Sequence, residues 1–446
     1  MSSSLSAASI GLFTEEAFHD HLRSQPAGAP SWWLDRKREA FARFSELPMP
    51  SRTDEGWRFS SRETLALQGF DAPDGVPPAP ALESILLGDT MAALTFVDGV
   101  LASRRSLPED LAAKGVVVGT LQEALTTHSA LLREHFMAQP QKLGSEKFAA
   151  LHTAFVTDGA FILVPKGVEL SAPIVVTHAS SGAGTQVFPH TLVLLEEQAK
   201  ATVVDLFLSS DRGSAPPNPG HPSAFACGAN DLYASHGSKL VYAAAQLWSH
   251  ATLSFQLNST VVRRDARVQS LNLHLGAQQA RHESLSQLQA PGAFSEMLAV
   301  TIASGDQEFD QRTLQIHQAP YTKSDLLYKN ALLDTARTIF SGLIVVDPDA
   351  QKTDAYQSNR NLMLSDTAEA SSLPGLEIQA NDVRCTHGAT SSRIDPEQLF
   401  YLQARGITPA KARELLVFGF FEEVLNRLEN DDLHALLRSL LQTHFH

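Results

Sequence analysis

Short apolar runs dominate the middle of the chain, from about Ala154 to about Ile378. Each run is rich in Val, Ile, Leu and Phe, and a polar residue or a glycine interrupts it after a few positions. Runs of this length and composition are typical of β-strands, and no convincing amphipathic helix lies between them. The pattern therefore predicts a long β-rich region. Examples of the predicted strands are Ala160 to Val164, Ile174 to Thr177, Thr191 to Leu195, Thr202 to Leu208 and Leu343 to Val346.

A weak repeat precedes several of these strands. In each copy a polar residue, any residue, a small residue and a second polar residue come just before the strand. The copies begin at Glu197, Arg264, Asp334 and Asp366, and a looser copy begins at His236. One turn and one strand per unit indicate a stacked solenoid in which each coil buries its face on the next. The spacing is uneven, so a β-sandwich remains an alternative, because many short strands also fit that fold.

The first part of the chain, residues 1–151, is predicted to be mostly helical. Apolar residues recur near helical spacing between Trp33 and Phe44, and Pro48 ends that segment. A turn-rich surface connection is expected from Asp71 to Pro80, and a short strand from Leu94 to Val97. This part is therefore expected to be a separate domain before a solenoid core that spans residues 152–380.

The last part of the chain, residues 381–446, is predicted to become helical at Asp395. Asp395 is a good N-cap and Pro396 fits the first helical position. Thr408 begins a second helix by the same logic, and a final helix is expected from Asp431 to Leu441. The segment is therefore expected to hold three helices.

Three aromatic residues of the second of these helices, Phe418, Phe420 and Phe421, lie too close together to share one narrow stripe. Apolar residues on several sides of a helix imply burial on more than one side. They either pack against the solenoid or form a docking face for another protein.

The charge and cysteine content exclude several classes of function. The 446-residue chain has a formal net charge of −14 and no Lys/Arg-rich run, which disfavours nucleic-acid binding. No apolar run has the length of a membrane span, and the N-terminus lacks the features of a secretory signal, so a cytoplasmic location is expected. Two cysteines cannot form a disulfide framework or hold a four-thiolate cluster. Any metal site must use few ligands or share them with a partner.

Cys385 and His387 are the most informative candidates for chemistry. In an extended segment, side chains two positions apart point to the same face. A thiolate and an imidazole then project together, and both suit iron or zinc. Tetrahedral iron or zinc needs about four ligands, so the pair is half a site or no site. The alternative to a metal ligand is a histidine that lies at a buried strand end and only makes a hydrogen bond there.

Three alternating amides, Gln357, Asn359 and Asn361, would share one face of a strand. Amides stacked on a solenoid face either form ladders or pair with an equivalent edge of another subunit, which predicts a dimer interface here. The sequence contains no nucleophile elbow, no Gly-rich phosphate loop and no His-Glu-x-x-His motif. The chain is therefore not expected to be an ATPase, although it could work with one.

The ordered motifs resemble the SufB/SufD family of iron–sulfur cluster assembly scaffold proteins. The segment Cys385-Thr-His-Gly-Ala-Thr390, followed by Leu399-Phe-Tyr-Leu402 and Arg405-Gly-Ile407, is similar to the C-terminal signature of that family. His387-Gly-Ala389 resembles the SufD form of the motif, whereas SufB chains typically carry a Glu after the His and additional cysteines. Further similar segments, in the same order, are Asp54-Glu-Gly-Trp-Arg58, His317 with Ser324 and Tyr328, Phe340-Ser-Gly342, Ala350-Gln-Lys-Thr-Asp-Ala-Tyr-Gln357, Asn361-Leu-Met-Leu-Ser365 and Leu376-Glu-Ile378.

The resemblance implies a right-handed parallel β-helix core with a helical domain at each end. It implies a non-enzymatic scaffold that works with a SufB-like paralogue and the ABC-type ATPase SufC, which the C-terminal helices are expected to contact. It also implies that His387, with Cys385, is a candidate ligand of a transient iron or iron–sulfur cluster at the interface with SufB, with no permanent cofactor. A homodimer is expected when the chain is isolated.

Two other classes of function stay open from the residues alone. A β-helix enzyme, such as a polysaccharide lyase or an acyltransferase, would need a groove with clustered acidic and basic residues. A self-contained metalloprotein would need three or four protein ligands around its metal. Neither set stands out in the sequence.

Overall fold

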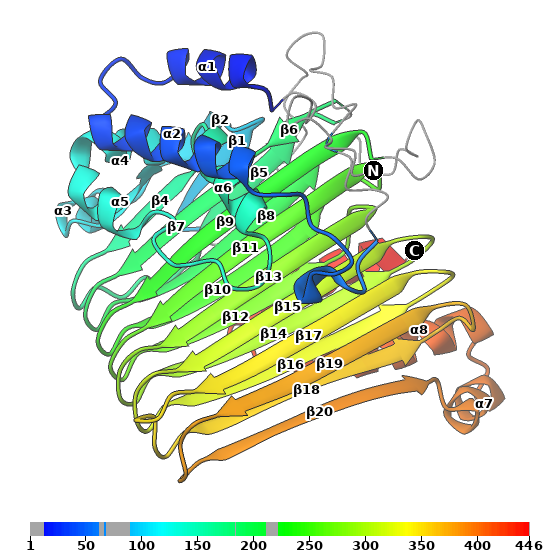
Figure 1. Cartoon of the computed structure of the whole chain (residues 1–446). Helices are drawn as coiled ribbons and strands as arrows, with labels where there is room; N and C mark the ends of the chain where they lie inside the picture. The colour runs from blue at the N-terminus through cyan, green and yellow to red at the C-terminus, as the bar shows by residue number, and fades with distance from the viewer. Residues whose placement is uncertain (1–12, 62–66, 68–89, 183, 211–221, 446) are drawn as a thin grey trace.

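Two long β-sheets face each other and form the body of the protein (Figure 1). The computed structural model describes residues 13–61, 67, 90–182, 184–210 and 222–445. The predicted turn-rich connection from Asp71 to Pro80 lies outside these described residues. Within those ranges, no helix combines the length and the apolar composition that a membrane-crossing helix needs.

Each sheet takes alternate strands of the chain. The first sheet, sheet A, consists in spatial order of β2 (Val100–Arg105), β1 (Ala92–Val97), β5 (Ile174–Ser180), β8 (Lys200–Ser209), β10 (Lys239–Leu247), β12 (Arg267–His274), β14 (Phe294–Ala303), β16 (Lys323–Leu332), β18 (Asp354–Met363) and β20 (Arg384–Arg393). Sheet B consists of β19 (Glu369–Ile378), β17 (Arg337–Val346), β15 (Glu308–His317), β13 (Gln279–Leu288), β11 (Thr252–Val262), β9 (Ala224–Ala234), β7 (His190–Leu195), β4 (Ala160–Val164) and β3 (Val117–Thr120), with β6 (Gln186–Val187) beside β9.

The strands from β4 to β20 pair in parallel within each sheet, which makes the body a solenoid of about eight turns. Gln279 is the register partner of Glu308, and Glu308 of Arg337, so one coil there takes 29 residues. Parallel pairing between neighbouring coils is the pattern that a β-helix requires. The predicted β-helix is therefore confirmed, and the β-sandwich alternative is wrong.

The repeat found in the sequence forms corners of several coils, before β8, β10 and β12 of sheet A and before β17 and β19 of sheet B. Gln198 and Asp265, at the second position of their copies, have positive φ angles of 60° and 54°, and Asp334, the first residue of its copy, has a φ angle of 53°. The small residue that follows turns inward and is fully buried, as at Ala199. A small side chain is needed there because the chain turns sharply between two packed sheets. The repeat thus corresponds to the turns at which the chain passes from one sheet of the solenoid to the other.

The solenoid extends beyond the expected limits of residues 152 and 380. Strand β1 precedes residue 151, pairs in parallel with β5 and agrees with the strand predicted from Leu94 to Val97, whereas β2 and β3 border the two sheets in antiparallel pairs. The last strand, β20, follows residue 380 and carries a largely polar sequence with no apolar run. Backbone pairing with β18 holds it in the sheet, so apolar patterning alone could not find it.

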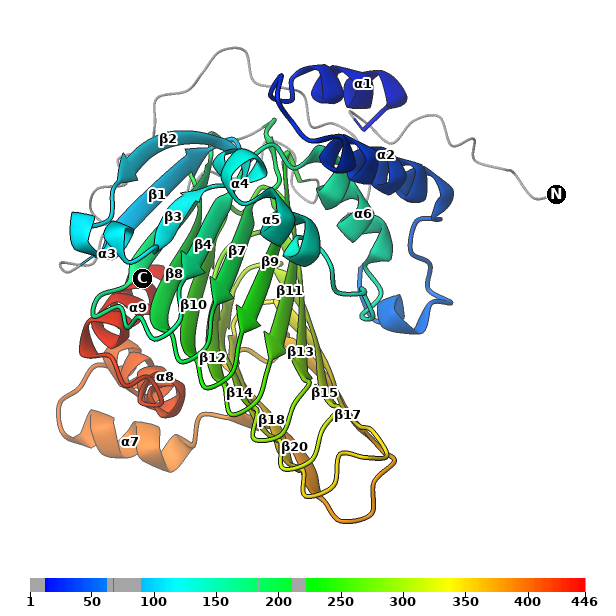
Figure 2. The same cartoon turned by 90° about the vertical axis from the view of Figure 1, so that its left-hand side faces the viewer.

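Three helices follow the last strand, as predicted: α7 (Pro396–Ala404), α8 (Pro409–Leu425) and α9 (Asp431–Phe445). The side chains of Asp395 and Thr408 accept backbone N–H groups at the starts of α7 and α8, and proline occupies the first turn of each helix. Helices α8 and α9 cover the outer face of sheet A (Figure 2). Their apolar residues, including Val417, Phe418 and Phe421, pack there against leucines of the sheet such as Leu271.

The N-terminal helices lie against the opposite sheet, sheet B (Figure 2). The described helices of this part are α1 (Glu15–Arg23), α2 (Ser31–Glu46), the short 3₁₀ helix η1 (Glu55–Trp57), α3 (Glu109–Ala113), α4 (Leu121–Thr127), α5 (Ser129–His135) and α6 (Glu146–Phe155). Helix α2 confirms the helix predicted around Trp33 and Phe44, both of which are buried. The solenoid is thus covered by helices on both outer faces.

Two buried lysines join α2 and α6, which pack side by side. Lys37 of α2 donates to three backbone carbonyls at the end of α6, the shortest contact being 2.6 Å to Val156. Lys147 of α6 donates to two carbonyls at the end of α2, at 2.6 Å each. The last carbonyls of a helix have no partner inside it and carry its negative dipole end. Each lysine therefore supplies the cap that the other helix lacks.

Replacing Lys37 with Met is expected to lower the free energy of unfolding by about 1–3 kcal/mol, because buried carbonyls lose their donor. Urea unfolding monitored by tryptophan fluorescence measures the change. Lys114→Met is the control: this exposed lysine pairs only with exposed Asp110, so its loss should change stability by less than about 0.5 kcal/mol. Equal effects of the two substitutions would contradict the capping role.

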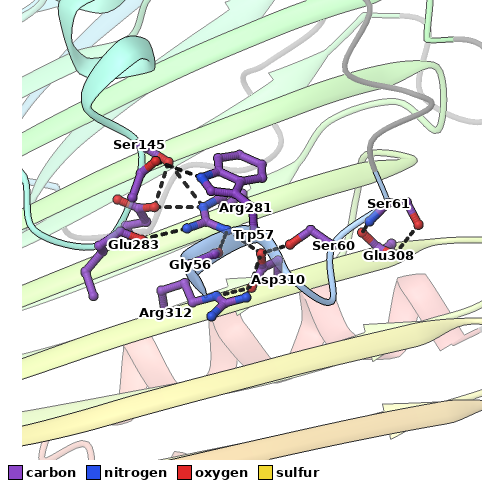
Figure 3. A network of polar contacts seen from close by, with 12 residues as sticks. Gly56, Trp57, Ser60, Ser61, Ser145, Arg281, Glu283, Glu308, Asp310 and Arg312 are labelled. Atoms are coloured by element: carbon purple, nitrogen blue, oxygen red, sulfur yellow. Dashed lines mark hydrogen bonds and ion pairs between the residues drawn. The ribbon is translucent and has the colours of Figure 1, made fainter. Parts of the chain in front are cut away.

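A clasp formed by the segment from Gly56 to Ser61 fastens the N-terminal part to the outer face of sheet B (Figure 3). The Trp57 ring stacks on the Arg281 guanidinium, with 3.9 Å between the guanidinium carbon and the ring centroid. Arg281 lies between two buried carboxylates, with 2.7 Å to Glu283 and 2.5 Å to Asp310. The Ser60 hydroxyl donates to Asp310 as well. The clasp contains Gly56 and Trp57 of the Trp-containing motif noted in the sequence.

Candidate functional site at the open end of the solenoid

The solenoid ends in two strands that are paired on one side only. Among the described residues, β20 pairs with β18 alone and β19 pairs with β17 alone. The coil therefore leaves two rows of backbone groups without strand partners, at the bottom of Figure 1. Such edges are templates for pairing with another chain unless they are covered. The open end is thus suited to binding a partner through backbone pairing.

Cys385 and His387 both lie on β20, and their side chains share one face of the sheet. In the register of β18 and β20, Cys385 is the partner of Ala355, and His387 is the partner of Gln357. Ala355 and Gln357 are buried between the two sheets. Residues in register on adjacent strands point the same way, so Cys385 and His387 point toward the inside of the last coil, which ends there.

The two candidate ligands have different surroundings. Cys385 is half-buried and packs near Leu376 and Val383. This burial raises the pKa of its thiol above the usual value, although a backbone hydrogen bond with Ala355 acts in the opposite direction. His387 is exposed. Among the described residues no three or more His, Cys, Asp or Glu side chains form a group that could hold a metal ion. The open end therefore offers two neighbouring donors and no complete site.

The three alternating amides do share a face, as the sequence indicates, but that face is the interior of the solenoid. Gln357, Asn359 and Asn361 are all nearly inaccessible to solvent. Gln357 donates to the carbonyls of Gly342 and Gly375, each at 3.2 Å, and so bridges the two sheets. An added Cβ at Gly342 would meet the Gln357 side chain. Their role at a dimer interface stays a prediction, and the exposed edges at this end belong to β19 and β20.

Some aromatic residues of the C-terminal helices are buried and others are exposed, and the sequence did not indicate which. Phe418 and Phe421 are buried against sheet A, and Phe420 is partly buried. Two aromatic residues of α7 are exposed instead, Phe400 by 72% and Tyr401 by 56%. Phe418 and Phe421 therefore pack α8 against sheet A, whereas the two α7 aromatics are open to solvent.

Comparison with known proteins identifies the family. A family model described as the SufBD core domain of SUF-system FeS cluster assembly matches residues 177–420. The chain belongs to the SufBD family. A second model, for the N-terminal region of SufBD proteins, matches residues 89–176.

Named relatives in this family cover most of the chain. The iron–sulfur cluster assembly protein SufD of Bacillus subtilis is 28% identical over 426 residues, which is 93% of this chain and 94% of that protein. SufD of Escherichia coli is 28% identical over 390 residues, 86% of each chain. The paralogue SufB of Bacillus subtilis is 25% identical over 417 residues, 90% of this chain and 86% of that protein.

The SufBD motif residues upstream of the open end are structural in this chain. His317 is buried, with its two ring nitrogens 2.7 Å from the Thr322 hydroxyl and 2.9 Å from the Ser324 hydroxyl. Tyr328 is also buried, against Phe340. These residues pack inside the coils of β15, β16 and β17, which precede β18 and β20. The signal that separates them from Cys385 and His387 is burial, which the sequence alone does not reveal.

Proposed function

We propose that this SufBD-family chain is a non-enzymatic scaffold subunit in iron–sulfur cluster assembly. One observation carries the proposal: Cys385 and His387 lie on one face of an unpaired last strand, where another subunit can approach them. Two donors form an incomplete site, and a partner subunit can supply the others. The iron or nascent cluster is cargo in this proposal, and His387 with Cys385 binds it transiently.

The proposed partner at the open end is a SufB-like paralogue. The relatives include both SufD and SufB proteins, and two solenoids of the same kind present compatible coil ends. Pairing of β19 and β20 with a paralogue across a two-fold axis would cover both unpaired edges. When the chain is isolated, a second copy would occupy the same edges, which gives a homodimer.

The proposed second partner is a SufC-like ABC-type ATPase that contacts α7. Phe400 and Tyr401 project from this helix, and the Arg405 guanidinium stacks on the Tyr401 ring at 4.4 Å. Exposed aromatic and arginine side chains are frequent anchors of protein interfaces. In this arrangement the domains are an N-terminal cover, a solenoid core and a C-terminal docking region. A cytoplasmic location belongs to the same proposal.

Co-purification from the extract of the source cells tests these partners. The tagged full chain is expected to bring down a SufB-like paralogue and an ABC-type ATPase. Replacing Phe400 and Tyr401 together with Ala should weaken ATPase capture by about tenfold or more, because each anchor is worth roughly 1–2 kcal/mol. Paralogue capture should not change.

The matched control is Phe421→Ala, which removes a buried aromatic of the neighbouring helix. It should lower the melting temperature, whereas the Phe400/Tyr401 variant should not. Full ATPase capture by the Phe400/Tyr401 variant would refute the proposed docking surface. Failure of the wild-type chain to capture a paralogue, together with turnover of a polysaccharide or acyl donor, would favour a β-helix enzyme.

A further inference from the structure

The interior of the solenoid is polar along its middle and apolar along its two edges. Apolar side chains such as Val262, Leu288 and Phe309 belong to one buried cluster near the ends of the strands, where the coils turn. Between these edges, amides and hydroxyls line the interior and bond to one another. For example, Asn230 donates to Asn258 at 2.8 Å, and Asn258 donates to Ser284 at 3.1 Å. Hydrogen bonds thus run from coil to coil along the axis.

Several side-chain atoms on this axis are buried without a hydrogen-bond partner among the described residues. On β15 they are the Thr313 hydroxyl, the Gln311 carbonyl oxygen and both amide atoms of Gln315. On β18 they are the Gln357 carbonyl oxygen and the Asn359 amide nitrogen. An unpaired buried polar group costs about 1–3 kcal/mol, so native proteins almost always give it a partner.

A small cavity lies on the same axis. Its volume is about 10 Å³, close to the least that one water molecule needs, and its lining includes Asn230, Tyr242, Asn258, Ser284 and Met297. Ser284 is the register neighbour of Thr313 in sheet B. The cavity and the unpartnered groups of β15 are therefore adjacent. Gln357 and Asn359 continue the series to the coil beside His387 and Ala389.

We propose that ordered water molecules bind along this axis and form a file from the cavity to the open end. Water satisfies donors and acceptors of mixed type at irregular spacing, which no single fixed side chain here does. The file ends at the open end of the solenoid, on the inner face of β20 that carries Cys385 and His387.

The water molecules can carry a proton away from Cys385, an inference that rests on the proposed function. When the Cys385 thiol binds an iron ion, its S–H bond breaks, an Fe–S bond forms and a proton is released. A partner that covers the open end separates this proton from bulk solvent. Water molecules held by Gln357 and Asn359 accept the proton on the inner side of the strand.

The sign of one stability change tests the water site. Thr313→Val removes a hydroxyl and keeps the shape of the side chain. If water binds the hydroxyl, the substitution lowers the melting temperature of the full chain by about 2 °C. If the hydroxyl is dry and unpaired, its removal raises the melting temperature. Thr301→Val is the control: the Thr301 hydroxyl accepts from Gln311 at 2.7 Å, so its loss lowers stability in either case.

A high-resolution crystal structure of the full chain gives the direct observation. Ordered water within hydrogen-bonding distance of Thr313 and Gln315 is expected, and the one at Thr313 should be displaced in Thr313→Val. An unchanged or raised melting temperature for Thr313→Val, or an absence of water density at both side chains, would overturn the proposal.

The proton path has its own readout in the complex with the paralogue. The double substitution Thr313→Val/Gln315→Met should slow proton release on iron(II) binding several-fold, as followed with a pH indicator, and leave the amount of bound iron unchanged. An unchanged release rate with normal iron binding overturns the path. If the wild-type complex binds no iron, the proposed function fails, while the Thr313 measurements still decide whether the water site exists.

Discussion

Replacing His387 with Ala is expected to lower cluster formation by about 10–100-fold while the complex with the paralogue still forms. The imidazole is exposed, and the structure shows no hydrogen bond between it and the described residues. Its removal should therefore change the free energy of unfolding by less than about 0.5 kcal/mol. Neutral imidazole binds iron readily, so the lost ligand should appear in assembly and not in stability.

Three measurements on the same preparation separate a ligand from a structural residue: complex formation by gel filtration, thermal unfolding, and cluster formation by visible absorption. Thr386→Ala is the matched control, because Thr386 lies between the two candidates on β20 and points to the opposite face. Cys385→Ala should have a smaller effect than His387→Ala if the imidazole is the main donor. Undiminished cluster formation by a stable His387→Ala complex would reject the ligand role.

Replacing Arg281 with Met should destabilise the protein by about 3–5 kcal/mol, the cost of leaving buried charges unpaired. Arg281, Glu283 and Asp310 are almost fully buried beneath the clasp (Figure 3). Burial by itself raises the pKa of Asp310, but Arg281 and Arg312 outweigh it and hold the pKa below its usual value. The substitution also removes the surface on which Trp57 stacks.

Urea unfolding near neutral pH measures this effect, and Arg337→Met serves as its control. Arg337 is partly exposed and lies 3.3 Å from Glu308, so its loss should cost about 1 kcal/mol or less. The folded-state pKa of Asp310 is depressed, so its pairing stabilises the wild type above the unfolded-state pKa and is lost as the pH falls. The Arg281→Met penalty should therefore shrink in acid. A penalty no larger than that of Arg337→Met would mean that the clasp is not held by this ion cluster.

The sequence by itself determined the kind of fold and the place of the candidate site. Short apolar runs and the repeated corner residues favour stacked coils over a β-sandwich, because each corner needs a residue that tolerates a positive φ and a small inward side chain. Local signals also placed the C-terminal helices, since Asp395 and Thr408 cap them through contacts only two or three residues away. The spacing of Cys385 and His387 was enough to place them on one face of an extended strand.

Only the tertiary structure decided which polar and aromatic residues are buried. Gln357 and Asn361 look like surface amides in the sequence but lie between two sheets, because partners from other coils surround them. Phe421 is covered by sheet A and Phe400 is not, although both lie in apolar helical segments. The polar strand β20 exists because β18 supplies its hydrogen bonds. Each of these outcomes depends on contacts between residues far apart in the chain. Local patterns of hydrophobicity do not predict such contacts.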